Sequence, residues 1–251
     1  RTDDFNELSA RAGISTTLDS INYFAQISLG FRPPQINEAY RLQKKQNVTD
    51  LDSETLTMFE FGSKFELESL MGSLSFYQSK KKNSIFRDSQ NFIVDNGKTD
   101  HKGVELSLSI FVNLRNTINA NITYGDHRYD FETDTSMREK IRVDNKIDTA
   151  PKIMANLLWN INVNDDSNLS LEIEHMDSYY TDAANLHEYE GHTLYHARFN
   201  REFSESLKGY LRIENLTDKR YAERADFNAF GGDRYFPGLP REVYVGLEYN
   251  F

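Results

Sequence analysis

Residues 242–251 read EVYVGLEYNF, and this stretch decides the fold. Every second residue from Val243 to Phe251 is apolar or aromatic, while Glu242, Gly246 and Glu248 fall on the alternate positions. A period of two places successive side chains on opposite faces of a β-strand. The stretch therefore predicts a strand with one apolar face and one largely polar face.

The same alternation recurs along the whole chain, and it predicts eleven strands. They lie near residues 8–18, 22–31, 54–67, 70–87, 100–113, 116–130, 150–163, 168–180, 190–203, 207–217 and 240–251. Short turns are expected near 19–21, 68–69, 114–115, 164–167 and 204–206, and long polar loops near 32–53, 88–99, 131–149, 181–189 and 218–239. Every second connection is therefore long, as in an outer-membrane barrel with short periplasmic turns and long extracellular loops.

Composition leaves two classes of β protein open. The 251 residues carry a net charge of −10, contain no Cys, and include 17 Phe and 14 Tyr. The mean hydropathy of −0.66 is that of a soluble acidic protein, yet a barrel also averages out as polar because only alternate residues meet lipid. The acidic charge disfavours a nucleic-acid partner. A soluble β-sandwich or β-solenoid is the alternative to a membrane barrel, and alternation alone does not separate them.

Strand length and loop alternation favour an all-β, antiparallel transmembrane barrel. Eleven is an odd number, whereas single-chain bacterial barrels have an even one, so we expect about half of a barrel with further strands upstream of Arg1. Alone, the chain should form an open, strongly curved sheet. Its convex face should carry Ile122, Trp159, Val243 and Leu247, and its concave face Glu105, Asn121, Arg198 and Glu248.

Three motifs resemble those of TonB-dependent outer-membrane receptors. The first is Phe31-Arg32-Pro33-Pro34 with Asn37-Glu38, the second is Asn215-Leu216-Thr217-Asp218-Lys219-Arg220-Tyr221, and the third is Phe236-Pro237-Gly238-Leu239-Pro240-Arg241 before the final strand. The resemblance implies that residues 1–251 are the C-terminal half of a twenty-two-stranded barrel, whose plug and N-terminal strands are absent from this sequence. It also implies a location in the outer membrane of a Gram-negative bacterium.

The family implies transport without covalent chemistry. The expected function is TonB-energised uptake of a scarce ligand, a ferric siderophore first, with a vitamin, haem or oligosaccharide as alternatives. A passive pore is the alternative of another class. Neither an enzyme activity nor a cofactor is expected. The implied partners are TonB, through an absent N-terminal segment, the barrel-assembly machinery, outer-membrane lipid and lipopolysaccharide, and an extracellular small molecule.

Most motif residues have a structural explanation. Pro33 and Pro34 end a strand because they cannot donate ladder hydrogen bonds, and Asn215 and Asp218 favour local turns. Gly238 permits an unusual backbone at the entry to the last strand. Ligand contacts are expected at Arg32, Tyr179 and Tyr180.

The remaining candidates lie in the last strand and among the histidines. Tyr244, Gly246, Tyr249 and Phe251 resemble the C-terminal assembly signal of outer-membrane proteins. His187, His192 and His196 are close in sequence without metal-ligand spacing, so no metal site is expected. No His occurs between Arg32 and Ser53, which weighs against haem. Polar residues such as Arg198, Glu202, Arg212, Glu214 and Glu248 either hold a plug or form a solvated wall.

Overall fold

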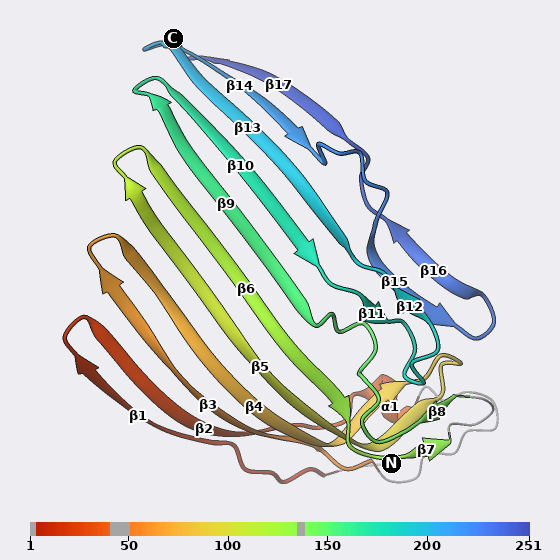
Figure 1. Cartoon of the computed structure of the whole chain (residues 1–251). Helices are drawn as coiled ribbons and strands as arrows, with labels where there is room; N and C mark the ends of the chain where they lie inside the picture. Colours follow the sequence, from red (N-terminus) through yellow and green to blue (C-terminus); the bar gives the residue numbers. More distant parts are fainter. Residues whose placement is uncertain (1–3, 41–50, 135–138) are drawn as a thin grey trace.

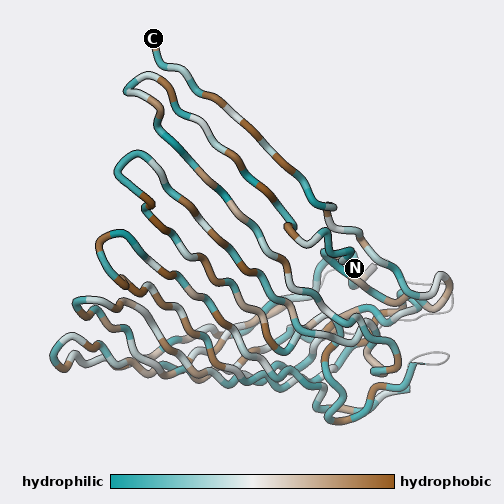
Figure 2. The backbone as a smooth tube through the Cα atoms, turned by 45° about the horizontal axis from the view of Figure 1, so that its top comes forward, coloured by the Kyte–Doolittle hydropathy of each residue, from teal (hydrophilic) through white to brown (hydrophobic). Residues whose placement is uncertain are grey.

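The computed structural model describes residues 4–40, 51–134 and 139–251. In these residues eleven strands form one antiparallel sheet, in the order β1-β2-β3-β4-β5-β6-β9-β10-β13-β14-β17 (Figure 1). Each strand pairs with the next strand of the sheet along the chain, so the predicted meander is confirmed. The sheet is a single open and strongly curved wall (Figures 1 and 2).

The strands of the wall agree closely with the eleven predicted from alternation. They are β1 Ala10–Leu18, β2 Ile21–Arg32, β3 Glu54–Leu67, β4 Leu70–Arg87, β5 Ile93–Asn113, β6 Asn116–Tyr129, β9 Ile153–Asn164, β10 Ser167–Met176, β13 His192–Ser204, β14 Leu207–Glu214 and β17 Glu242–Tyr249. The five short turns lie together at one end of the wall, and the long connections lie at the other end (Figure 1).

The long connections contain secondary structure of their own. Three hairpins, β7 Thr133–Asp134 with β8 Lys140–Ile141, β11 Tyr179–Tyr180 with β12 Glu188–Tyr189, and β15 Ala222–Asn228 with β16 Gly232–Pro237, lie at the long-loop end (Figure 1). A single helical turn, α1 Ile36–Tyr40, follows β2. No helix in the described residues is long and apolar enough to cross a membrane. The predicted loops at 32–53 and 131–149 include residues 41–50 and 135–138, which lie outside the described residues.

The predicted loop at 88–99 is wrong in its second half. Strand β5 already begins at Ile93, which pairs with Arg87 and is buried. The chain reverses within residues 88–92, where the Asp88 carboxylate accepts the backbone N–H groups of Gln90 and Phe92. Alternation could not indicate this extension, because register shifts between Lys81 and Phe86 break the period of two.

Two other predicted strands are too long at the long-loop end. The strand expected at 168–180 stops at Met176, and Tyr179–Tyr180 pairs with β12 instead of continuing the wall. The strand expected at 207–217 stops at Glu214, because Asn215 adopts a φ of +49° that a strand cannot continue. The remaining strand ends differ from the predicted positions by no more than a few residues.

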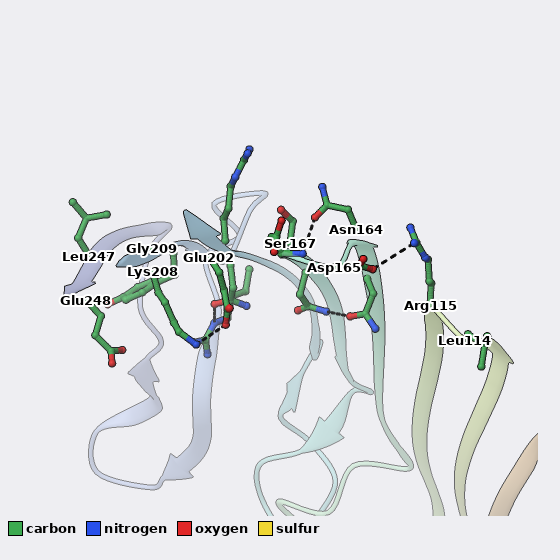
Figure 3. Close-up of a pocket in the computed structure, with 17 residues that line it drawn as sticks. Leu114, Arg115, Asn164, Asp165, Ser167, Glu202, Lys208, Gly209, Leu247 and Glu248 are labelled. Atoms are coloured by element: carbon green, nitrogen blue, oxygen red, sulfur yellow. Dashed lines mark hydrogen bonds and ion pairs between the residues drawn. The ribbon is translucent and has the colours of Figure 1, made fainter. Parts of the chain in front are cut away.

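The wall has no core between two sheets. Apolar side chains of one face, including Ile122, Trp159, Val243 and Leu247, are exposed, and this sheet is the only large one in the described part of the chain. Hydrophobic and hydrophilic residues alternate along each strand (Figure 2). Leu247 and Glu248 point to opposite sides of the arch, with Glu248 on the inner side (Figure 3). The β-sandwich alternative is therefore wrong, and the prediction of a half-barrel with its apolar face exposed is confirmed.

Both edges of the wall are open. β1 pairs only with β2, and β17 pairs only with β14, so the sheet does not close on itself in the described residues. All nine residues of β1 are exposed. Open edges do not occur in a bilayer, where unpaired backbone groups cost several kcal/mol each. The wall therefore needs further strands to span a membrane.

Candidate functional site

The long loops at one end of the wall fold together into a cap with small cores of its own. Tyr179 and Tyr189 pack with Ala222 and Ala225, which joins the hairpins β11–β12 and β15–β16. Two further clusters of buried apolar residues are Leu51 with Ile85 and Ile93, and Tyr129 with Ile141 and Ala183. These cores contain side chains from all five long connections or the strand tips beside them. The cap is therefore a packed structure that covers one end of the wall.

Backbone hydrogen bonds and one buried carboxylate tie different loops of the cap together. Glu139 accepts the N–H groups of Ser89 and Ala183, at 2.8 and 2.9 Å, and so bridges three connections. Phe227 donates its N–H to Thr181 O, and Ala229 donates to Ser89 O, each at 3.0 Å. These bonds satisfy backbone groups that a loop would otherwise lose when it is buried. They fix the relative positions of the loop tips.

A small hollow of about 230 Å³ lies inside the cap, lined by charged groups of both signs. Its carboxylates include Asp148, Asp182 and Asp226, and its cations include Arg224 and Arg234. Asp226 is paired with both arginines, at 2.8 Å to Arg224 and 2.5 Å to Arg234. Asp226 and the two arginines are therefore already paired with one another.

The carboxyl groups of Asp148 and Asp182 are less well compensated than that of Asp226. Burial raises the pKa of Asp148, which accepts a 2.7 Å hydrogen bond from the Tyr129 hydroxyl. Burial also raises the pKa of Asp182, although it accepts the N–H groups of Leu186 and His187. In both cases desolvation of the charged form outweighs the hydrogen bonds. In the sequence each of these residues is only one acidic residue in a polar loop, so no pattern singles it out.

Arg32 holds the first motif together. The strand ends there, Pro33 and Pro34 redirect the chain, and α1 brings Glu38 back to Arg32 in a two-pronged contact of 3.0 and 3.1 Å. The Arg32 Nε atom also donates to Glu54, the buried first residue of β3. Glu54 accepts further contacts from Lys81 and from the Ile85 N–H, both at 2.8 Å. The motif thus ties the ends of three strands to one buried carboxylate.

The tyrosines predicted to contact ligand differ from each other in burial. Tyr179 is buried, and its hydroxyl accepts the Ala225 N–H at 2.8 Å. Tyr180 is partly exposed, and the Lys146 ammonium group lies 5.7 Å from its ring centre. Tyr189, which the sequence analysis did not single out, makes the same kind of contact as Tyr179. Its hydroxyl accepts the Ala222 N–H at 3.0 Å. The ligand contacts at Arg32, Tyr179 and Tyr180 remain predictions.

The second and third motifs form a single clasp at the base of hairpin β15–β16. Asn215 is almost fully buried, and its amide donates to the carbonyl groups of Lys219 and Leu239 at 2.9 and 3.2 Å. Asp218 accepts the Arg241 N–H at 2.9 Å. Each motif therefore supplies groups that the other needs, although about twenty residues separate them.

Gly238 completes the clasp, since a Cβ atom there would lie 2.1 Å from the Tyr221 ring. The Gly238 N–H also donates to Tyr221 O at 3.0 Å. Leu216 lies on the partly exposed side, where the Arg241 guanidinium reaches its carbonyl oxygen at 3.5 Å. Pro237 ends β16, and Pro240 precedes β17. The motif residues thus hold the hairpin to the wall.

The inner side of the wall is polar near the short turns. A hollow of about 820 Å³ is lined there by residues that include Arg198, Glu202, Lys208 and Glu248 (Figure 3). Lys208 is paired with Glu202, and Arg115 lies 3.5 Å from Asp165 at the rim (Figure 3). Among the described residues that line this hollow, the apolar or aromatic ones are Leu114, Tyr210 and Leu247, and the Leu247 side chain points to the outer side of the wall (Figure 3). This surface suits a polar partner or water.

The residues of the predicted assembly signal lie on both faces of β17. Tyr244 and Gly246 share the inner face with Glu248, and the Tyr210 ring packs where a Cβ of Gly246 would lie. Tyr249 and Phe251 are exposed, with ring centres 5.1 Å apart. Their recognition by an assembly machinery remains a prediction.

Comparisons with known proteins identify relatives of this fold. The sequence matches the family model described as "TonB dependent receptor-like, beta-barrel" over residues 1–216. Among solved structures, the ferric-catecholate import receptor Fiu from E. coli K12 is similar, with 18% identity, a TM-score of 0.75 and coverage of 97% of this chain and 35% of that chain. No curated protein sequence matches this chain.

Two other solved structures show the same likeness. The siderophore receptor PiuA from Acinetobacter baumannii has 19% identity, a TM-score of 0.79 and coverage of 96% of this chain and 35% of that chain. The copper transporter OprC has 15% identity, a TM-score of 0.76 and coverage of 97% of this chain and 40% of that chain. Identities this low show the fold alone. The chain spans between 35% and 40% of the length of these three proteins.

Proposed function

Since this chain belongs to the TonB-dependent receptor β-barrel family, we propose that it is the C-terminal part of an outer-membrane receptor that takes up a scarce ligand with energy from TonB. The family and the similar structures are receptors and transporters, which is consistent with an absence of enzyme chemistry. The proposal places residues 1–251 in the wall of the barrel. The plug and the segment that binds TonB belong to the part of the receptor outside this sequence.

The observation that carries the proposal is the contrast between the two sides and the two ends of the wall. An exposed apolar face suits lipid, a polar inner face suits a plug, and open edges suit further strands of the same barrel. The folded cap lies at one end only. In a receptor this end faces the outside of the cell, where the ligand arrives, and the short turns face the periplasm.

We assign a ferric siderophore as the first candidate ligand. The support is the description of Fiu and PiuA as receptors for ferric catecholates and siderophores. A copper complex is the next candidate because of OprC, followed by a vitamin, haem or oligosaccharide. Arg32, Tyr179 and Tyr180 lie in or beside the cap, on the side from which a ligand would enter.

The assembly and lipid partners follow from the same placement. The last strand, with Tyr244, Gly246, Tyr249 and Phe251, would be recognised by the barrel-assembly machinery. The exposed apolar face would contact outer-membrane lipid, with lipopolysaccharide in the leaflet nearest the cap. A Phe251→Ala substitution should lower the amount of receptor in the outer membrane more than the amount synthesised.

Growth under iron limitation tests the proposed uptake. A strain that lacks all its other siderophore receptors should grow on one of a set of ferric catecholates, hydroxamates or citrate only when it expresses this receptor. The growth should disappear when TonB is deleted. Growth that persists without TonB would indicate the passive pore instead, and no growth on any siderophore would direct the search to other ligands.

A further inference from the structure

Two histidines that are 26 residues apart in sequence form a close pair on the wall. His101 in β5 and His127 in β6 are register partners, and their Nδ1 atoms lie 3.0 Å apart. Both belong to the inner face, since they share the side of their strands with Glu105 and Asn121. Both side chains are partly exposed. The pair is separate from the cap hollow and from the motif clasp.

The neighbours of the pair hold the rings in place. Thr99 Oγ1 lies 2.8 Å from His101 Nε2, and a hydroxyl that accepts the Nε2–H leaves the Nδ1 lone pair of His101 free. Gly125 makes room for the other ring, because a Cβ atom there would lie 2.3 Å from His127 Nε2. A hydrogen bond to the second ring nitrogen is the usual support of a metal-binding histidine.

The spacing of the two nitrogen atoms fits one shared metal ion. Nitrogen atoms 3.0 Å apart, each about 2.0–2.1 Å from an ion, subtend an angle of roughly 90–97° at that ion. This is the angle between neighbouring ligands in square-planar or octahedral geometry, which Cu²⁺ and Ni²⁺ favour. A hydrogen bond between two ring nitrogen atoms needs a proton on one of them. A metal ion would displace that proton, and both rings would turn so that their Nδ1 lone pairs face the ion.

The charges around the pair are of both signs. Lys81 lies on the adjacent strand, opposite Thr99, and its ammonium group is paired with Glu54 at 2.8 Å. Asp100 and Asp126 flank the two histidines in sequence, on the opposite face of the sheet. In the described residues, no group of three or more His, Cys, Asp or Glu side chains is placed to hold a metal. A metal here would therefore keep several exchangeable positions.

We propose that His101 and His127 form a two-imidazole site for a first-row transition-metal ion, with Cu²⁺ bound most tightly. The remaining positions are filled by water or by donor atoms that arrive with the metal. Cu²⁺ stands above Zn²⁺ and Ni²⁺ in affinity for nitrogen ligands, which gives the expected order. The site depends on strand register and ring geometry, and it is independent of which ligand the receptor takes up.

Copper titration of the complete receptor in detergent tests the site. After removal of metals with a chelator, the receptor should bind Cu²⁺ in a site whose pulsed EPR spectrum shows two equatorial imidazoles. His101→Gln or His127→Gln should leave one imidazole and lower the affinity at least tenfold. Thr99→Val should weaken binding several-fold while both imidazoles remain, because only the support of His101 is lost.

His187→Gln is the matched control, since His187 lies in the cap, away from the pair. Its ring stacks on the Phe227 ring with 3.7 Å between the ring centres. It should leave the two-imidazole signal and the affinity unchanged. Heat-modifiable migration on gels confirms that each variant is folded. A wild-type spectrum without two imidazoles, a signal that survives in His101→Gln, or a signal lost in His187→Gln would each overturn the proposal. Uptake assays play no part in this test, so its failure would leave the proposed transport intact.

Discussion

The wall and the cap are stabilised in different ways. Each buried apolar residue in the described part of the chain lies in the cap or at the strand tips beneath it, for example Ile141, Tyr179 and Ala225. The strands of the wall instead expose large apolar residues such as Phe61, Trp159 and Val245. The cap is built around small clusters of buried apolar residues, whereas the wall has no such core and exposes one apolar face. Substitutions in the cap should therefore act through its buried apolar clusters, and substitutions in the wall should act through its exposed apolar face.

The largest expected difference between the two ends is accessibility on intact cells. The chain has no native Cys, so single cysteines report their own positions. Ala229→Cys, in the turn of the cap hairpin β15–β16, should react with a membrane-impermeant thiol reagent added outside the cells. Ser69→Cys and Ser206→Cys, in the short turns, should react only after the outer membrane is permeabilised. The reverse pattern would invert the orientation of the wall.

A charge on the apolar face should destabilise the wall strongly. Leu157 is exposed on that face near the middle of β9, and an Arg at the bilayer midplane costs about 2–4 kcal/mol. Its neighbour Asn156 points inward, where Glu172 accepts a 2.6 Å hydrogen bond from it. Leu157→Arg should therefore lower the free energy of unfolding in lipid vesicles by that amount, and Asn156→Arg by less than about 1 kcal/mol. Equal losses would contradict the assignment of the two faces.

The strands of the wall could be predicted from the sequence because the alternation of apolar and polar residues is a local pattern. A period of two needs only neighbouring residues, so strands such as β9 and β17 were identified almost to their ends. The clasp was only half predictable, since the turn-forming character of Asn215 and Gly238 is visible in sequence but their mutual contact is not. The cap and the His101–His127 pair were not predictable, because they depend on register and on contacts between distant loops.

Removing the carboxylate that joins the wall to the cap should have an intermediate effect. Glu54→Ala would leave the Ile85 N–H buried without an acceptor and deprive Arg32 and Lys81 of their shared partner. The expected loss is about 2 kcal/mol, because an unsatisfied buried donor costs about 1–3 kcal/mol. Hydrogen exchange at residues 81–87 should speed up accordingly. Glu54→Gln keeps an acceptor for Ile85 and should cost about half as much.

The smallest expected effect concerns one buried carboxyl group and the pH. Burial raises the pKa of Asp148 above its ordinary value of 3.8, so the folded cap binds this proton more tightly than the unfolded chain does. Its contribution to stability is therefore complete below the ordinary value, and it declines as the pH rises through the raised pKa. Asp148→Asn keeps an acceptor for the Tyr129 hydroxyl and removes the charge. At pH 7 the variant should exchange amide hydrogens in residues 139–149 slightly more slowly than the wild type, after correction for the intrinsic rate. At pH 4 the difference should shrink.

Asp226→Asn, which breaks two ion pairs, should instead speed exchange in the cap at pH 7. Faster exchange in Asp148→Asn at pH 7 would show that the charged form of Asp148 stabilises the cap.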